Sequence, residues 1–196
     1  MIQLLYVLFG LGLGCAVGIA IGVRERRQWK QLAEHDPLTG ALSRLGGANV
    51  VEKWTGLSRP FSAVLFDVAN LHTANHVLGL NGGDAILRRI SGVLRKRDGD
   101  HVVRLGGDEF LLLLPGEALE GAYAARDRLE WEVGAEALAP GVSAFLVGAP
   151  LAWKPLGPSL EELIGPASTA LEERKQRVKR EMGEAPTREE ARRRAG

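Results

Sequence analysis

The residues best suited to chemistry lie in a short acidic turn between two apolar segments. Residues 101–105 and 109–114 each have the composition of a β-strand, and Gly106-Gly107-Asp108 separates them. Glycines adopt the positive φ of a tight hairpin without steric cost, and they let a phosphorylated ligand approach the backbone closely. A plain hairpin needs only the glycines. The adjacent carboxylates of Asp108 and Glu109 at its tip therefore suggest a ligand site. The flanking sequence decides between such a site and a plain structural turn.

A further acid closes another apolar segment. Residues 61–66 predict a buried strand that ends at Asp67. If this strand lies beside the hairpin, Asp67 and Asp108 would provide the two carboxylates with which proteins hold divalent ions against phosphate groups. An acid at the end of a strand can also cap a helix, and that alternative stays open.

The run from Gly106 to Phe110 resembles the signature of the GGDEF family, diguanylate cyclases that condense two GTP molecules into cyclic di-GMP. The resemblance covers residues 36 to about 180. It begins with Asp36-Pro37-Leu38-Thr39-Gly40, which is similar to the start of the family's domain. The family's spacing is kept without a gap from Asp67 to Asp84, and five positions match: Asp67, Asn75, Gly79, Gly83 and Asp84.

The resemblance implies a fold and a metal site. The fold is α+β, an α/β sandwich with a central, mostly antiparallel sheet flanked by helices, like the nucleotide cyclase and polymerase palm folds. The implied cofactor is Mg²⁺ or Mn²⁺, held by the carboxylates of Asp67 and Asp108 and by the carbonyl of Val68. Asp108 would also help to deprotonate the attacking hydroxyl, with Glu109 as an auxiliary group.

The resemblance also implies contacts to GTP and to the product. Asn75 and Asp84 occupy the guanine-contact positions, although Asp84 could simply cap a helix that begins at Gly83-Asp84. The implied phosphate contacts are His72, Gly106, Gly107, Lys175 and Lys179. Arg97 and Asp100 match the family's product-inhibition site, and a charged turn is the alternative there. The sequence departs from the family pattern at Leu71, at His72, which replaces a lysine, and around Lys175.

The remaining elements are read from composition and period. Residues 117–133 predict a helix and residues 141–148 a strand. A proline-rich loop containing Pro150 then leads to a last helix over residues 159–180. Residues 181–196 form a charged tail that is expected to be frayed.

Residues 1–23 carry no charged side chain and are long enough to span a bilayer core of about 30 Å, so they predict one transmembrane helix. Arg24, Arg26 and Arg27 follow, which predicts a single-pass protein of the inner membrane with the domain in the cytoplasm. Residues 24–35 predict a helical stalk. Glycines at every fourth position of the apolar run favour a homodimer, although glycine is also common in membrane helices.

Composition limits the partners and the chemistry that can be expected. The net charge of +1 gives no reason to expect a nucleic-acid polymer as partner. The only cysteine, Cys15, excludes an internal disulfide, and the histidines show no zinc-like spacing. Together with the predicted membrane helix, the resemblance then leaves three expectations: a membrane-anchored diguanylate cyclase, a weak or inactive GGDEF domain that binds cyclic di-GMP or GTP at the membrane, or a tethered dimerisation domain without nucleotide. The retained acids favour the enzyme.

Overall fold

The computed structural model describes residues 24–25, 29–134, 145–152 and 159–184. Within these ranges a four-stranded sheet has the order β2-β3-β1-β4, and all its neighbouring strands are antiparallel. The strands are β1 (Phe61–Ala69), β2 (His101–Gly106), β3 (Glu109–Pro115) and β4 (Phe145–Ala152). The predicted antiparallel sheet flanked by helices is therefore confirmed.

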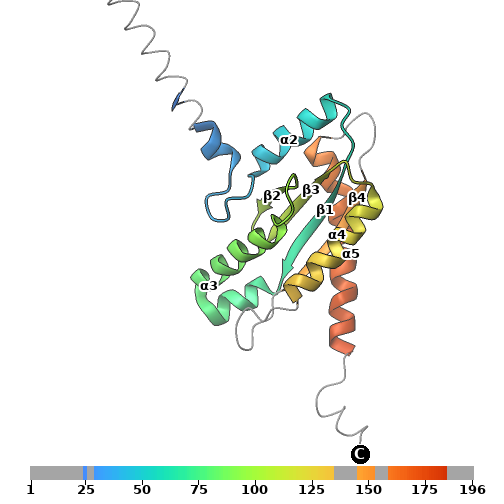
Figure 1. Ribbon diagram of the computed structural model, residues 1–196. Helices are drawn as coiled ribbons and strands as arrows, with labels where there is room; N and C mark the ends of the chain where they lie inside the picture. The colour runs from blue at the N-terminus through green and yellow to red at the C-terminus, as the bar shows by residue number, and fades with distance from the viewer. Residues whose placement is uncertain (1–23, 26–28, 135–144, 153–158, 185–196) are drawn as a thin grey trace, which may run out of the picture.

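Helices cover both faces of this sheet (Figure 1). The helices are α2 (Arg44–Gly56), α3 (Leu71–Leu94), α4 (Leu119–Gly134) and α5 (Leu160–Glu184). Side chains of α3 and α4 form one buried cluster with Phe66, Phe110 and Leu112 of the central strands. Side chains of α2 and α5 form the other with Leu65 and Leu111. The two clusters follow from the alternation of side chains along β1 and β3, which are apolar on both faces.

Both edges of the sheet are covered at their middle. Beside β2, the backbone of Leu42 accepts a hydrogen bond from Arg104 N at 2.7 Å and donates one to Val102 O at 2.8 Å. Beside β4, the carboxylate of Glu130 accepts a hydrogen bond from Gly148 N at 2.7 Å. Arg174 Nη2 of α5 donates to the same carboxylate at 2.7 Å, so α4 and α5 are joined across this edge.

Four predicted boundaries are wrong, and one of them is the end of the last helix, which continues past the predicted residue 180 to Glu184. Strand β1 does not end at Asp67 but continues to Ala69, because residues 67–69 still pair with β4. The helix that contains Asp84 does not begin at Gly83-Asp84. Helix α3 starts at Leu71 and is interrupted at Gly79, whose φ of 73° is a conformation that glycine adopts without strain. Pro150 does not lie in a loop but pairs with Val64 inside β4.

The N-terminal segments are described only in part. The predicted transmembrane helix over residues 1–23 lies outside the described residues. In the part of the chain that the structure describes, no helix has the length and apolar character needed to cross a membrane. Residues 29–34 of the predicted stalk are helical, and the turn at residues 36–40 separates them from the domain.

Candidate functional site

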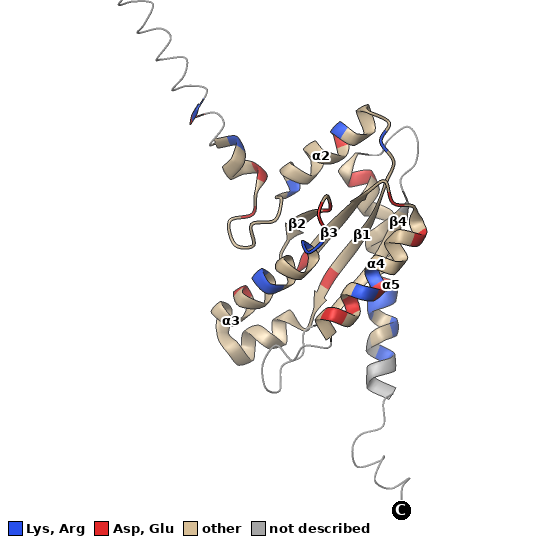
Figure 2. Ribbon diagram, viewed as in Figure 1, with Lys and Arg blue, Asp and Glu red and all other residues tan. Residues whose placement is uncertain are grey.

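Asp67 is the one charged residue of β1 and lies at the centre of the candidate site. Figure 2 shows an acidic band on the otherwise uncharged strand β1. Only 4 % of its surface is exposed. Its neighbours across the sheet are Glu109 of β3 and Val147 of β4. Lys175 of α5 reaches over the sheet and places its Nζ 2.9 Å from Asp67 Oδ2. Strand β1 thus holds an acid that three other elements, β3, β4 and α5, surround.

Asp108 comes to the same place from the turn between β2 and β3. Its backbone carbonyl accepts a hydrogen bond from Val68 N at 3.0 Å, so the turn is fastened to the end of β1. Gly107 supplies the positive φ, 49°, that this tight turn requires. Asp67, Asp108, Lys175 and His72 all line one cavity of about 460 Å³. Two acids and one cation, distant in the sequence, therefore face one hollow.

Two charged groups of this cavity, Asp67 and Lys175, have shifted pKa values. Burial raises the pKa of Asp67 above its ordinary value, and the nearby charge of Asp108 raises it further, although the hydrogen bond from Lys175 opposes the shift. For Lys175, burial works to lower the pKa, but the hydrogen bond and charge of Asp67 outweigh it and raise the pKa. Perturbed acids of this kind, gathered in a cavity, are typical of functional sites.

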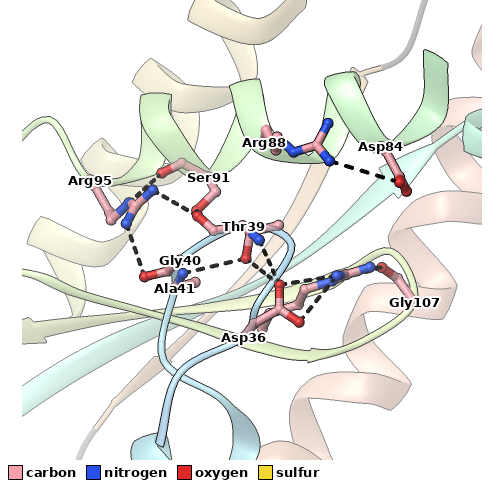
Figure 3. A network of polar contacts seen from close by, with 10 residues as sticks. Asp36, Thr39, Gly40, Ala41, Asp84, Arg88, Ser91, Arg95 and Gly107 are labelled. Carbon is pink, nitrogen blue, oxygen red and sulfur yellow. Dashed lines mark hydrogen bonds and ion pairs between the residues drawn. The ribbon is translucent and has the colours of Figure 1, made fainter. Parts of the chain in front are cut away.

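The predicted guanine contacts are adjacent to one another but do not line this cavity. Asn75 lies before the interruption of α3 and Asp84 after it. A Cβ atom on Gly83 would lie 1.7 Å from Asn75 Oδ1, so the amide packs directly against Gly83. Asp84 forms an ion pair of 4.0 Å with Arg88 (Figure 3). A second hollow of about 360 Å³ opens on this part of α3, lined in part by Leu78 and Ile86.

The structure describes the side chains or backbone of all the predicted phosphate contacts except the side chain of Lys179. Gly106 and Gly107 are exposed at the turn, and His72 lies on α3 with its Nε2 atom 3.1 Å from Nε2 of His76. Lys175 is paired with Asp67, a predicted metal ligand. Lys179 follows one turn later on α5, and its side chain lies outside the described residues.

The predicted product site holds a charged pair of its own. Arg97 Nε lies 3.9 Å from Asp100 Oδ1, and the guanidinium also pairs with Glu117. The side chain of Asp100 is 2 % exposed, and burial raises its pKa. Its Oδ2 atom is buried and has no hydrogen-bond partner. The turn is therefore more than a solvated loop, because it keeps an acceptor free beside an arginine.

The sequence alone did not single out Arg104, whose partners Asp36 and Gly107 are labelled in Figure 3. Its guanidinium donates to Asp36 Oδ1 at 3.1 Å and to the carbonyl of Gly107 at 2.7 Å. It therefore ties residues 36–40 to the acidic turn. The available signal was a single charge within the apolar segment 101–105, only two positions before Gly106. Arg95, which directly follows α3, donates to the carbonyls of Thr39 and Gly40 at 2.8 and 3.0 Å.

The donor set of the cavity suits a hard cation. Among the described residues no three His, Cys, Asp or Glu side chains gather into a group that could hold a metal alone. Mg²⁺ does not need such a cage, because it binds one or two carboxylates and completes its shell with phosphate oxygens and water. Asp67 and Asp108, which line the same cavity, are two such carboxylates.

Comparison with known proteins identifies the family of the chain. Residues 33–181 match the family model described as diguanylate cyclase, GGDEF domain. The chain is 29% identical to diguanylate cyclase DgcM of Escherichia coli K12 over 154 residues, 76% of this chain and 37% of that protein. It is 35% identical to diguanylate cyclase DgcP of Pseudomonas aeruginosa over 113 residues, 54% of this chain and 17% of that protein. The chain thus spans well under half the length of these relatives.

Solved structures show the same fold. The coiled coil and GGDEF domain of DgcB from Caulobacter crescentus, solved with cyclic di-GMP, superposes with a TM-score of 0.70 at 19% identity, covering 84% of this chain and 92% of that one. Diguanylate cyclase SiaD of Pseudomonas aeruginosa, solved with its activator SiaC, gives a TM-score of 0.67 at 24% identity, covering 86% and 69%.

Proposed function

The chain belongs to the family of diguanylate cyclase GGDEF domains, and on that premise we propose that it condenses two GTP molecules into cyclic di-GMP with release of pyrophosphate. The observation that supports this proposal best is the meeting of Asp67 and Asp108 in one cavity with Lys175. A structural hairpin would have no reason to place a second buried acid opposite its tip. The retained acids also distinguish a catalyst from a dimerisation domain without nucleotide.

The reaction has two equivalent halves. The 3′-hydroxyl oxygen of one GTP attacks the α-phosphorus of the other, the new P–O bond forms, and the bond to the leaving pyrophosphate breaks. The hydroxyl proton passes to a carboxylate, for which we assign Asp108 with Glu109 as the auxiliary group. Asp67, Asp108 and the Val68 carbonyl would hold Mg²⁺ or Mn²⁺. Such ions would offset the negative charge of the attacking and leaving oxygens.

The remaining predicted residues bind the nucleotide. Asn75 and Asp84 would read the guanine edge, because a carboxylate accepts from its N1–H and amino group and an amide reads the rest. Lys175 is already held in the cavity by Asp67. Its ammonium would bind a phosphate from this position, and a cation held by Asp67 would balance the charge of the carboxylate. Gly106, Gly107, His72 and Lys179 complete the set of proposed phosphate contacts.

Each domain would hold one GTP, so two domains must face each other and the working form is a homodimer. A membrane helix over residues 1–23 would anchor the chain in the inner membrane and raise the effective concentration of its partner. The nucleotide cavity would then lie on the cytoplasmic side, where GTP is available.

A second candidate function is binding of cyclic di-GMP at Arg97 and Asp100. Two features favour it, namely the buried, unpartnered Oδ2 of Asp100 and the relatives solved with cyclic di-GMP. In an active enzyme this site would give product inhibition. In an inactive one it would make the domain a binding module at the membrane. Substitution of Arg97 by alanine should abolish this binding in a calorimetric titration, while the catalytic acids remain intact.

Product formation from GTP tests the main proposal. The full chain, purified in detergent and supplied with GTP and Mg²⁺, should form cyclic di-GMP detectable by chromatography. Asp108→Ala should lower the rate by about 100-fold or more, because a proton acceptor and a metal ligand are lost together. Glu120→Ala, an exposed acid on α4, is the matched control and should keep the wild-type rate. A folded, dimeric wild type that makes no product would exclude the enzyme, and product from Asp108→Ala would exclude the metal assignment.

A further inference from the structure

Two histidines pair on the exposed surface of α3. His72 and His76 are four residues apart, so both rings project from the same side of the helix. Their Nε2 atoms are 3.1 Å apart, and their ring planes are inclined at 89°. Both residues are exposed, so solutes can reach the two nitrogens. The histidines lack the spacing of a four-ligand structural zinc site, but the helix gives this pair a different geometry.

The distance between the nitrogens matches the needs of a metal ion. Zinc binds histidine nitrogens at about 2.0–2.1 Å in a tetrahedral arrangement, which places two such nitrogens roughly 3.3 Å apart. Square-planar coordination at a similar bond length places adjacent nitrogens about 2.9 Å apart. The observed 3.1 Å lies between these values. We propose that His72 and His76 form a binding site for a divalent transition-metal ion of the zinc class.

The pair is already arranged for binding. Without a metal ion, Nε2–H of one ring donates a hydrogen bond to Nε2 of the other, and this bond keeps both nitrogens turned toward one point. For both Nε2 atoms to bind an ion, the donor ring moves its proton from Nε2 to Nδ1, and the two side chains turn their lone pairs toward the ion while the backbone of α3 stays in place. Among the described residues no third His, Cys, Asp or Glu joins the pair, so two protein ligands are assigned to the ion.

This site is chemically distinct from the pair of carboxylates. Imidazole nitrogens select zinc, copper and nickel, whereas carboxylate and phosphate oxygens suit magnesium. The two sites are nevertheless neighbours, because His72 lines the same cavity as Asp67 and Asp108. An ion on the histidines would add positive charge at the edge of that cavity and favour a bound triphosphate. This last consequence rests on the proposed function, whereas metal binding without nucleotide does not.

Metal binding is measured directly. The full chain, purified without a histidine tag, is titrated with Zn²⁺ in competition with a chromophoric chelator, in the absence of nucleotide and of Mg²⁺. One zinc ion should bind per chain. Either His72→Gln or His76→Gln should weaken this binding about 10-fold or more, since each removes one of two protein ligands. His35→Gln removes another exposed histidine outside the pair and should leave the affinity unchanged.

A rearranged variant separates spacing from histidine content. Thr73→His combined with His76→Gln keeps the number of histidines but puts two of them at adjacent positions, where they do not face each other on a helix. Its affinity should fall to that of His76→Gln. Wild-type affinity in this variant, or in the His72→Gln/His76→Gln double variant, would overturn the proposal, and so would a wild type that binds no zinc. Each of these results holds whether or not the protein makes cyclic di-GMP.

Discussion

At the scale of single residues, Asp67 is held where its charge is unfavourable. Because its pKa is raised in the folded state, its contribution to stability is fully present below the ordinary value of 3.8 and is lost as the pH rises through the raised value. At pH 7 the ionised carboxylate therefore opposes folding. Residues that are placed for function often have such a cost.

Asp67→Asn should raise the free energy of unfolding at pH 7 by about 1 kcal/mol and abolish product formation. Lys175 loses its partner but is 34% exposed at its side chain and can turn to water. The gain should shrink as the pH falls toward 4, which urea melts at several pH values would measure. Asp108→Asn, at a half-buried acid, is the comparison and should give a smaller gain. A destabilised Asp67→Asn at pH 7 would contradict the assignment of Asp67 as a strained residue.

Gly83 offers a second prediction, because its missing side chain leaves room for the Asn75 amide. Gly83→Ala should displace that amide, destabilise the protein by about 1–3 kcal/mol and raise KM for GTP more than it lowers kcat. Gly92→Ala in the same helix is the matched control, since a Cβ there meets no atom within 4 Å. It should stabilise by about 0.5–1 kcal/mol and leave KM unchanged. Equal kinetic effects of the two substitutions would remove Asn75 from the GTP site.

At the scale of elements, the acidic turn depends on a contact with residues 36–40. Burial works to raise the pKa of Asp36, but hydrogen bonds from Thr39 and Arg104 outweigh it and hold the pKa below 3.8. Stability from this group is therefore present above pH 3.8 and is lost as the pH falls through the lowered value. The Arg104 guanidinium also donates to the Gly107 carbonyl. One side chain therefore stabilises both the segment 36–40 and the acidic turn.

Asp36→Asn should destabilise the domain by about 1–3 kcal/mol at pH 7, because hydrogen bonds to a charged group are lost. The difference from wild type should narrow in urea melts below pH 4. Arg104→Lys keeps the charge but loses the planar fork, and it should lower the catalytic rate by loosening the turn that carries Asp108. Asp98→Asn, at an exposed aspartate, serves as control. A pH-independent effect of Asp36→Asn would show that the ion pair is not what supports the turn.

Sequence alone predicted the elements better than their boundaries. Apolar runs and the glycine turn sufficed for β1, β2 and β3, because strands buried on both faces leave a strong pattern. The pattern could not show that Asp67 stays in the sheet, since a polar residue normally ends a buried run. It also could not show the break at Gly79, because a single positive φ leaves the composition of the helix unchanged.

The candidate site divides in the same way. The carboxylates of Asp67 and Asp108 were predicted from residue type together with a family resemblance, and the structure brings them together. The pairing of Lys175 with Asp67 joins residues 108 positions apart, which no local pattern reveals. Arg104 was missed for a similar reason, because its partners are defined only when residues 36–40 fold against the hairpin.

At the scale of the whole molecule, the sheet separates two cores that should act independently. Leu129 of α4 lies in the cluster on one face and Leu171 of α5 in that on the other, with 1% and 3% exposure. Each substitution by alanine should cost about 2–5 kcal/mol in chemical denaturation. The double variant should lose the sum within about 0.5 kcal/mol, because the two sites share no partner. A large deviation from additivity would mean that the faces are mechanically coupled through the sheet.

The protected edges of the sheet bear on how two copies can meet. Along β4, the outward N–H of Gly148 is taken by Glu130, and Pro150, which has the same orientation two residues later, has no N–H to offer. Along β2, the backbone of Leu42 occupies the centre of the edge. Neither the β2 edge nor the β4 edge can therefore pair along its middle with a strand of another chain. Two copies of the domain must therefore associate through side-chain surfaces. Such a contact is reversible and can form and dissociate in every catalytic cycle without disrupting either sheet.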